Sequence, residues 1–393
     1  MKLCGAASEG SGAGKSPVGH SARILISSGE RVGSPNTKKV LAVVAVALAV
    51  AMALSAAKKN KNGEDETQAL QLPKELPSTV AGETRRLLFY TTPLSAKGLL
   101  SQQIKDALKS LERQAGGNTV LQIRAFVAGS GDLRRVRELV SETFTDRRQP
   151  LPVLSLIQAG GLPLDGAQVV LEAIAAGKKD LHPGGLAFIP AQAFFSASPL
   201  DPVAPLVEQS LTRLRQAVGA AGADASDVLR VTCFLSSLDN IAATRQLVEA
   251  SYARAALNYM QAQRASMRGM AACEAVAGLR GPPPRTGAES PIAVVTAPHV
   301  VLTGTQVSFG YEGSDARLAF ERLGKALEPA GSNLHEVAFA HFYPVSQKIE
   351  DQIQALRPAF FDAAHPPAAS LVQIEGLSSL DAGFAMDVVA AKN

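Results

Sequence analysis

The chain has 393 residues, enough for two to four domains of ordinary size, and its 46% hydrophobic and 19% charged residues are typical of globular domains plus one apolar segment. The net charge of +4 is too small for this length to indicate a nucleic-acid-binding surface or general adhesion to membranes. The six histidines are scattered and the three cysteines form no CxxC pair, so the sequence predicts no metal site and no disulfide framework. We expect no cofactor, because the one phosphate-loop-like stretch, GSGAGKS, follows no predicted strand.

The amino-terminal part of the chain carries a long apolar segment. Residues 1–37 are rich in Gly, Ser and Ala and show no periodicity, which predicts a disordered tail. The uncharged run 40–57 has a lysine pair at each end; its 18 residues would span roughly 27 Å as a helix, just enough to cross a hydrocarbon core. We therefore predict a transmembrane helix or signal over residues 38–59, followed by a tether over residues 60–84.

Three interpretations of this segment stay open. It is a single-pass membrane anchor, a cleaved secretory signal ending near the small residues 55–57, or a buried helix of a soluble protein. Basic residues are slightly more numerous before the run than after it, which favours an internal amino terminus and exported domains, on the periplasmic or extracellular side. Cleavage would make the protein secreted.

The rest of the chain contains one pattern three times, in the strand-like stretches 154–159, 257–262 and 369–374. Each stretch has a small polar residue second, apolar residues third and fourth, and glutamine fifth; the glutamines are Gln158, Gln261 and Gln373. An acidic residue follows each glutamine after 13 or 14 positions, in a second apolar stretch: Glu172, Glu274 and Asp387. Chance rarely gives such agreement three times.

The residues before each stretch agree as well. Apolar residues at intervals of three and four predict a helix that a glycine ends, then a strand, then a second amphipathic helix. The first helices contain Ile104, Leu206 and Leu318, and they end at Gly116, Gly222 and Gly331. The strands that follow cover residues 120–127, 228–235 and 337–343. The second helices begin near Leu133, Ile241 and Ile349. Shorter strands precede each set, at 87–91, at 186–191, and at 292–296 with 300–305.

The repeated unit is therefore β(β)αβαββ, of roughly 90–100 residues, and the fold class is α/β (α+β). Helices with one apolar face should cover one side of each sheet, and the opposite faces of three sheets can cover one another about a pseudo-threefold axis. We predict domains at residues 85–177, 184–279 and 290–393, which form an intramolecular pseudo-trimer that needs no further copy.

These repeats resemble the RidA (YjgF) family of enamine/imine deaminases. The resemblance covers roughly residues 85–392 and is carried by residues 152–175 in the first copy and by residues 301–306, 330–331 and 366–368 in the third. It implies a chorismate-mutase-like fold and three copies in one chain in place of the family's homotrimer.

The resemblance also locates the family's reactive residues, and both kinds are replaced. An arginine that grips the substrate carboxylate in a cleft between subunits would correspond to Leu154, Leu257 and Ala369. A glutamate that positions the attacking water would correspond to Val170, Ala272 and Ala385. None of these side chains holds an anion or orients water, so we expect a catalytically degenerate protein with an unknown catalytic residue.

Other residues are candidates for the site. Arg147, Arg148 or Arg254 could swing into a cleft and restore a cation, or they could be solvated loop arginines. Gly304 matches a family turn whose backbone approaches the ligand, or it is an ordinary glycine at a strand end. The three repeated glutamines line a pocket or face solvent.

The acids and the cysteines have ordinary structural interpretations. We expect Glu172, Glu274 and Asp387 to end strands in water rather than to act as general acids. Cys233 and Cys273 lie among apolar strand residues, which predicts inert buried thiols.

Three functions compete. The first is a membrane-tethered pseudo-trimer that binds a small metabolite or a partner protein in clefts lined by Leu154, Leu257 and Ala369. The second is an enamine/imine deaminase that uses a relocated arginine. The third is an RNA-cleaving activity, which the absence of a basic stripe with interleaved aromatics and of a histidine pair disfavours.

Overall fold

The computed structural model describes residues 74–129, 131–282 and 292–392, and they belong to one compact unit. The predicted tail, the transmembrane segment 38–59 and most of the tether lie outside these residues. Within the described part, no helix is long and apolar enough to cross a membrane, and no three metal-binding side chains are grouped.

The described chain is α+β, as predicted, and it contains three sheets with the same order of elements. We name each sheet with its own helices a lobe. Lobe 1 has the sheet order β2-β5-β3-β4, in which only β3 and β4 run parallel. Its elements are β2 (Leu87–Thr91), α2 (Leu100–Ala115), β3 (Thr119–Ala128), α3 (Leu133–Asp146), β4 (Val153–Ala159) and β5 (Val169–Ala176).

Lobe 2 repeats this arrangement as β6-β9-β7-β8. Its elements are β6 (Gly185–Phe195), α4 (Ala204–Ala220), β7 (Val228–Leu235), α5 (Ile241–Tyr252), β8 (Ala256–Gln261) and β9 (Met270–Leu279).

Lobe 3 has the order β11-β15-β13-β14, with β12 also paired to β15. Its elements are β11 (His299–Thr303), β12 (Gln306–Phe309), α6 (Gly313–Leu327), β13 (Val337–Pro344), α7 (Gln347–Leu356), β14 (Ala368–Leu371) and β15 (Ala382–Lys392).

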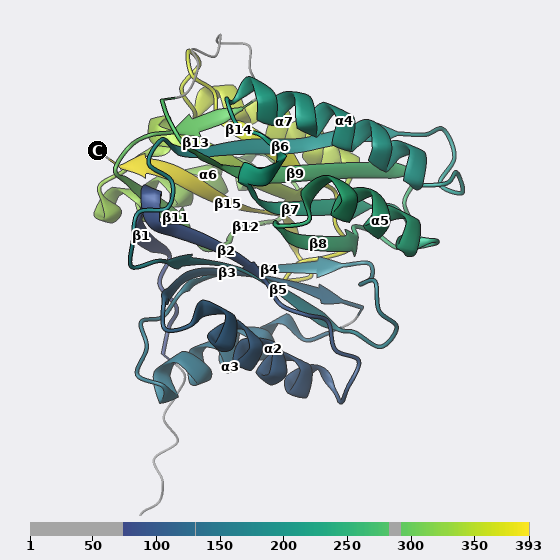
Figure 1. Ribbon diagram of the computed structural model, residues 1–393, viewed down its shortest axis with the longest axis horizontal. Helices are drawn as coiled ribbons and strands as arrows, with labels where there is room; N and C mark the ends of the chain where they lie inside the picture. Colours follow the sequence, from purple (N-terminus) through teal and green to yellow (C-terminus); the bar gives the residue numbers. More distant parts are fainter. Residues whose placement is uncertain (1–73, 130, 283–291, 393) are drawn as a thin grey trace, which may run out of the picture. The chain divides into compact units, whose positions relative to one another are not determined.

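The helices lie on one face of each sheet, as Figure 1 shows for α2 and α3 and for α4 and α5. The apolar stripe of α2, with Ile104, Leu108 and Leu111, is buried against the lobe 1 sheet. Gly116 ends this helix in the left-handed conformation with φ 56°, which a residue with a Cβ adopts at a cost.

The opposite faces of the three sheets pack on one another. Phe126, Phe234 and Tyr343, one from each lobe, belong to one buried cluster. A second cluster joins Leu87, Phe188 and Phe339, and the Phe188 and Phe339 rings stack with centroids 5.4 Å apart.

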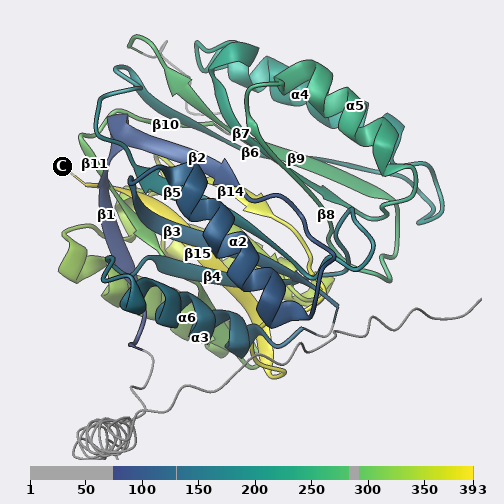
Figure 2. The same cartoon turned by 60° about the horizontal axis from the view of Figure 1, so that its bottom comes forward.

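Each lobe also receives the segment that leads into another lobe. β1 (Thr79–Glu83), which precedes lobe 1, pairs with β11 of lobe 3, and β10 (Ala293–Val295), which precedes lobe 3, pairs with β6 of lobe 2. The segment 177–184, which leads into lobe 2, donates backbone hydrogen bonds to Arg85 and Arg86 beside β2. Figure 2 shows β1 beside β11 and β10 beside β6.

This exchange corrects the predicted tether. The sequence pattern extends the tether to residue 84, whereas residues 79–83 form β1. Local periodicity cannot reveal this strand, because its hydrogen-bonding partner comes from the other end of the chain.

Candidate functional site

Two of the positions singled out by the sequence line one cleft between lobes 1 and 2. Leu257 of β8 is one of the residues that the resemblance equates with the family's arginine, and Val170 of β5 is one that it equates with the family's glutamate. They come from different lobes and line the same cavity of about 400 Å³, which we call cleft 1–2. Two positions that the sequence analysis selected, one from each lobe, thus line one interlobe cleft.

Cleft 1–2 contains a cation that the sequence analysis did not select. The guanidinium of Arg245, on α5, donates a hydrogen bond of 3.1 Å to the Pro163 carbonyl of lobe 1. The same guanidinium lies 5.9 Å from the centroid of the Tyr259 ring, and Glu249 lines the cleft one helical turn later. On sequence alone, an arginine four residues before a glutamate is typical of a solvated helix face, so no local pattern marks Arg245.

Two hydroxyl groups of cleft 1–2 lack a hydrogen-bond partner within the described residues. They are the Tyr259 phenol and the Thr91 hydroxyl, and both oxygens are buried. Burial raises the pKa of Tyr259, and the Glu249 carboxylate raises it further against the opposing charge of Arg245. The phenol is therefore neutral near pH 7.

A second cavity, of about 300 Å³, lies between lobes 2 and 3, and we call it cleft 2–3. Ala272 of β9, at a position of the family's glutamate, lines it. Ala369, at a position of the family's arginine, is half-buried on β14, two residues before Leu371, which lines the cleft.

The junction of lobes 3 and 1 is closed at the corresponding point. Thr305 donates its N–H to the Leu154 carbonyl over 3.1 Å, and its hydroxyl accepts the Leu156 N–H over 3.0 Å. A Cβ on Gly304 would lie 3.0 Å from the Leu154 carbonyl oxygen, so glycine permits this close approach. Leu154 is 3% exposed and Ala385 is fully buried.

The arginines proposed as substitutes lie elsewhere. Arg147 forms an ion pair of 3.2 Å with Glu112 inside lobe 1. Arg148 and Arg254 are exposed, and none of the three lines cleft 1–2 or cleft 2–3. Arg245, by contrast, lines cleft 1–2 together with Leu257.

The repeated glutamines have mixed roles. The side-chain amides of Gln158 and Gln261 donate to the backbone carbonyls of Gly129 and Ser236, respectively. Gln373 lines cleft 2–3, where its amide donates to Gln347 and Glu350.

The expectation that the three acids end strands in water is wrong. Glu172, Glu274 and Asp387 are each 1% exposed and meet where the three sheets face one another. One guanidinium, that of Arg124 on β3, lies within 3.3 Å of Glu172, 3.5 Å of Glu274 and 3.3 Å of Asp387. The lobes thus share a buried ion cluster, which the spacing of the acids revealed only in part because their partners come from other strands.

The other members of the cluster balance the acids. Arg230 lies 3.4 Å from Glu274, while the imidazole of His341 lies 2.9 Å from Glu274 and 3.0 Å from Asp387. The side chains of Thr232 and Asn258 donate hydrogen bonds to Glu172.

Electrostatics favour the charged forms of Glu274 and Arg124 in this cluster. Burial opposes the charge of Glu274, but His341, Arg124 and Arg230 outweigh it and lower the pKa of Glu274 to about 2. Burial likewise opposes the charge on Arg124, yet the surrounding acidic groups raise its pKa. Glu274 is therefore ionised near neutral pH and does not serve as a proton donor there.

No family model matches the sequence, and no curated protein matches it. Solved structures similar to the chain include a YjgF-family protein from Neisseria meningitidis, at 15% identity over 26% of this chain and 84% of that one, with a TM-score of 0.23. A member of the YjgF/YER057c/UK114 family from Mycobacterium tuberculosis is 21% identical over 25% of this chain and 83% of that one, with a TM-score of 0.23. Yeast Mmf1 is 17% identical over 28% of this chain and 91% of that one, with a TM-score of 0.22.

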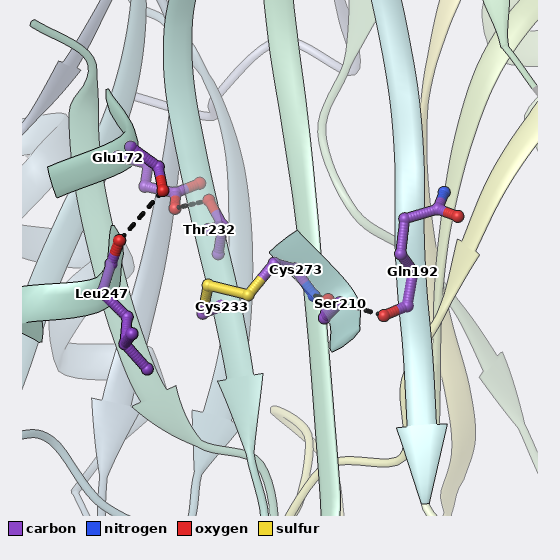
Figure 3. Close-up of a disulfide and its surroundings, with 8 residues drawn as sticks. Glu172, Gln192, Ser210, Thr232, Cys233, Leu247 and Cys273 are labelled. Atoms are coloured by element: carbon purple, nitrogen blue, oxygen red, sulfur yellow. Dashed lines mark hydrogen bonds between the residues drawn. A yellow bond between two sulfur atoms is a disulfide. The ribbon is translucent and has the colours of Figure 1, made fainter. Parts of the chain in front are cut away.

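The cysteines depart from the sequence prediction. Cys233 and Cys273 are buried, as expected, but they form a disulfide instead of two free thiols. They are direct cross-strand partners on β7 and β9, which the sequence pattern alone does not reveal. Figure 3 shows the bridge next to Thr232, the residue that bonds Glu172 of lobe 1.

Proposed function

We propose that the protein is a membrane-tethered, catalytically degenerate pseudo-trimer of three RidA-like copies that binds a small carboxylate metabolite in cleft 1–2. The observation that carries this proposal is the Arg245 guanidinium, which lines that cleft together with Leu257 and Val170 and, among the described residues, donates to the Pro163 carbonyl alone.

The ligand class follows from the chemistry of the walls. The Arg245 guanidinium donates to a single carbonyl, so its other N–H groups can hold a carboxylate. Leu257 and Val170 beside it are apolar and favour a short hydrocarbon portion. A small monocarboxylate satisfies both requirements.

The proposed loss of deaminase activity rests on Leu257 and Val170. A deaminase must orient a water molecule at the substrate, and neither Leu257 nor Val170 has a hydrogen-bonding side chain. The mapped positions of the other lobes, among them Leu154 and Ala272, are also apolar.

Binding by the folded full chain tests the proposal. We expect 2-oxobutyrate, a small monocarboxylate, to raise the unfolding temperature and to give a heat signal in calorimetry. Arg245→Met should weaken this binding at least about tenfold, because a charge-assisted bond is lost. Arg254→Met, an exposed arginine of the same lobe, is the matched control, and equal affinities of the two variants would refute the role of Arg245.

Two features support the proposed membrane tether and the proposed export of the three lobes. The 18-residue uncharged run 40–57 is long enough to span a bilayer. The Cys233–Cys273 disulfide belongs in an oxidising compartment. Membrane fractionation, protease protection and thiol alkylation of the protein in its native cells test this part; a reduced, protease-protected protein would contradict export.

An enamine/imine deaminase is the second candidate. Arg245 supplies a cation beside Leu257, and Glu249 of the same helix could orient water. Imine generated by an amino-acid oxidase and trapped by semicarbazide measures the activity. Hydrolysis faster than in buffer, lost in Arg245→Met and retained in Arg254→Met, would replace the binding proposal with this one.

A further inference from the structure

The exposed apolar side chains of the molecule are concentrated at one end of its strands. Within the described part of the chain, eight of the ten large apolar side chains that are exposed lie in two kinds of loop or at the strand ends beside them. They are Leu99 and Leu164 in lobe 1, Phe195, Leu200 and Met267 in lobe 2, and Phe309, Tyr311 and Leu380 in lobe 3. We call these eight residues the apolar end face. Single exposed leucines are ordinary, but exposed apolar residues at corresponding places of three lobes form one feature.

The two kinds of loop lie side by side in every lobe. One kind connects the strands β4 and β5, β8 and β9, or β14 and β15, and the other kind leads into α2, α4 or α6. In lobe 1, the Gln103 amide bonds a carbonyl of each loop. In lobe 2, the Gly269 N–H donates to the Ser198 carbonyl over 3.0 Å, and in lobe 3 the Tyr311 hydroxyl donates to the Leu380 carbonyl over 2.8 Å.

The loops that connect strands also bond one another across the lobes. The Arg264 side chain of lobe 2 donates to the Gly160 carbonyl of lobe 1 over 2.9 Å, and its N–H donates to the Glu375 carboxylate of lobe 3 over 2.7 Å. The Gln158 N–H of lobe 1 donates to the Gly376 carbonyl of lobe 3 over 3.0 Å. The apolar end face is therefore a single surface around the junction of the three lobes.

The packing of the fold does not require these side chains to be apolar. Leu162 and Leu377 of the same loops are buried in the cluster that contains Phe126, whereas Leu380 is 99% exposed. Met267 and Leu200 are 91% and 92% exposed. The exposed residues thus gain little from the folded chain itself, which points to a partner outside it.

Charged residues stand directly beside the exposed apolar ones, and this excludes a dry protein interface. Exposed charged residues follow Leu164, Leu200, Met267 and Leu380 in the sequence: Asp165, Asp201, Arg268 and Asp381. A partner protein would have to bury these charges, whereas protein interfaces are depleted of charge at their centre. The headgroup layer of a bilayer solvates charged groups while neighbouring apolar side chains reach the acyl boundary.

The chain enters the described structure near this end. The Ser141 hydroxyl of α3 donates to the Lys74 carbonyl over 2.6 Å, and Ser141 lies about 12 Å along the helix from Leu133, where α3 begins. Asp132, which precedes α3, lines one surface cavity together with Leu99 of the apolar end face. The 16 residues 58–73, between the apolar run 40–57 and Lys74, can cover about 53 Å. This length is ample for the apolar end face to reach a bilayer that holds the run 40–57.

We propose that the apolar end face contacts a membrane, and that its partner is the zwitterionic surface of the bilayer to which the chain is tethered. The inference rests on the tether of the proposed function. Leu200, Met267 and Leu380 enter the boundary between headgroups and acyl chains, where their apolar area leaves water. The tether keeps the face close to the bilayer, so contacts that are weak one by one suffice. Acidic residues outnumber basic ones beside the exposed side chains, so the contact needs no anionic lipid.

Tryptophan fluorescence tests this contact, because the chain has no tryptophan of its own. Met267→Trp and Leu380→Trp would be made separately in the full chain, which is reconstituted into phosphatidylcholine vesicles that contain lipid brominated on its acyl chains. Leu181→Trp is the matched control, since Leu181 is 47% exposed and lies between β5 and β6, at the opposite end of the strands. We expect bromolipid to quench the two reporters at least about twice as strongly as the control and their emission to shift to shorter wavelength.

A charged variant checks that the apolar side chains make the contact. In a chain with Leu99→Trp as the reporter, adding Met267→Asp and Leu380→Asp should remove most of the quenching. Both replaced residues are more than nine-tenths exposed, so the unfolding temperature should stay the same.

Flotation of the vesicles separates the two proposals. A chain that does not float with the vesicles would overturn both the tether and this inference. A chain that floats, with Met267→Trp and Leu380→Trp quenched no more than Leu181→Trp, would overturn this inference alone. Quenching of the Leu99→Trp reporter that survives the two aspartates would also overturn it. A shift of the Met267→Trp emission without vesicles that grows with protein concentration would identify a second copy as the partner, against the bilayer.

Discussion

Arg124 contacts acids of all three lobes, which requires that the three lobes differ from one another at this position. Its guanidinium lies within 3.5 Å of a carboxylate from every lobe, and the equivalent positions on β7 and β13 hold Thr232 and His341. Three arginines at one point would repel one another, whereas this chain places a cation, a hydroxyl and an imidazole there. The asymmetry places two arginines and one histidine in contact with the three acids.

Arg124→Met should be strongly destabilising. The variant keeps a similar apolar stem but leaves three buried carboxylates with fewer cations, which costs about 3–5 kcal/mol in the free energy of unfolding. Urea denaturation of the variant and of Arg134→Met, an arginine whose side chain is 82% exposed, measures the difference. A loss of less than about 1 kcal/mol for Arg124→Met would show that the cluster contributes little to stability.

The Glu274 carboxylate makes a pH-dependent contribution. Its pKa is lowered to about 2 in the folded chain, against about 4.3 for an unfolded glutamate. Stability is therefore fully present above about pH 4.3 and is lost as the pH falls through about 2. Glu274→Gln should unfold at a lower temperature at pH 7, and its deficit should shrink between pH 4 and pH 2. A deficit that stays constant over this range, as expected for an uncharged packing effect, would contradict the assignment; Glu321→Gln, at an exposed position, is the control.

For single residues, the sequence predicted which residues are equivalent in the three lobes better than it predicted what surrounds each of them. The spacing of Glu172, Glu274 and Asp387 correctly marked equivalent points of the three sheets. Their burial was missed because it depends on Arg124 and His341, which local patterns assign to ordinary strands. Arg245 was not selected from the sequence for the same reason, since its role depends on contacts with the neighbouring lobe.

Among the elements, those with a strong local period were predicted closely. The strand at 87–91 and the strand at 228–235 match β2 and β7 as observed, and the six amphipathic patterns fall on α2 to α7. β1 and β12 were not predicted, because both are short and gain their stability from strands distant in sequence. Leu318 belongs to the apolar pattern that predicted α6, yet it is 49% exposed, and the buried residues of α6 include Ala316, Ala319 and Phe320.

The disulfide between β7 and β9 should stabilise lobe 2. It closes a loop with a sequence separation of 40 residues, and a cross-link of this length contributes about 2–4 kcal/mol, mainly by restricting the unfolded chain. The double variant Cys233→Ala, Cys273→Ala should therefore unfold at a lower urea concentration than the parent, with little change in the ligand affinity of cleft 1–2. Reductant added to the native parent should have little effect, because both cysteines are fully buried. Identical midpoints for variant and parent would show that the bridge is not formed in solution.

At the scale of the whole molecule, the lobes are held together in two independent ways. The first is burial, since the inner sheet faces share two apolar clusters and the ion cluster. The second is exchange of leading segments, because β1 lies on lobe 3, residues 177–184 lie on lobe 1 and β10 lies on lobe 2. The exchange closes a ring: lobes 2 and 3 each gain an edge strand that leads into another lobe, and lobe 1 accepts backbone hydrogen bonds from residues 177–184, so no lobe can leave without breaking backbone hydrogen bonds to a neighbour.

A cut between lobes 2 and 3 should therefore leave the molecule intact. We would insert a specific protease site within residues 283–291, which lie between described residues, and cleave the folded protein. The two fragments should co-elute in size exclusion and separate only in denaturant, because β10 and β1 each hold lobe 3 to another part of the chain. The same cut combined with Arg124→Met should release lobe 3 at a lower denaturant concentration, since Arg124 is the cation of lobe 1 that contacts Asp387. Fragments that separate in native buffer would show that covalent linkage, rather than the shared core and the exchanged strands, holds the three lobes together.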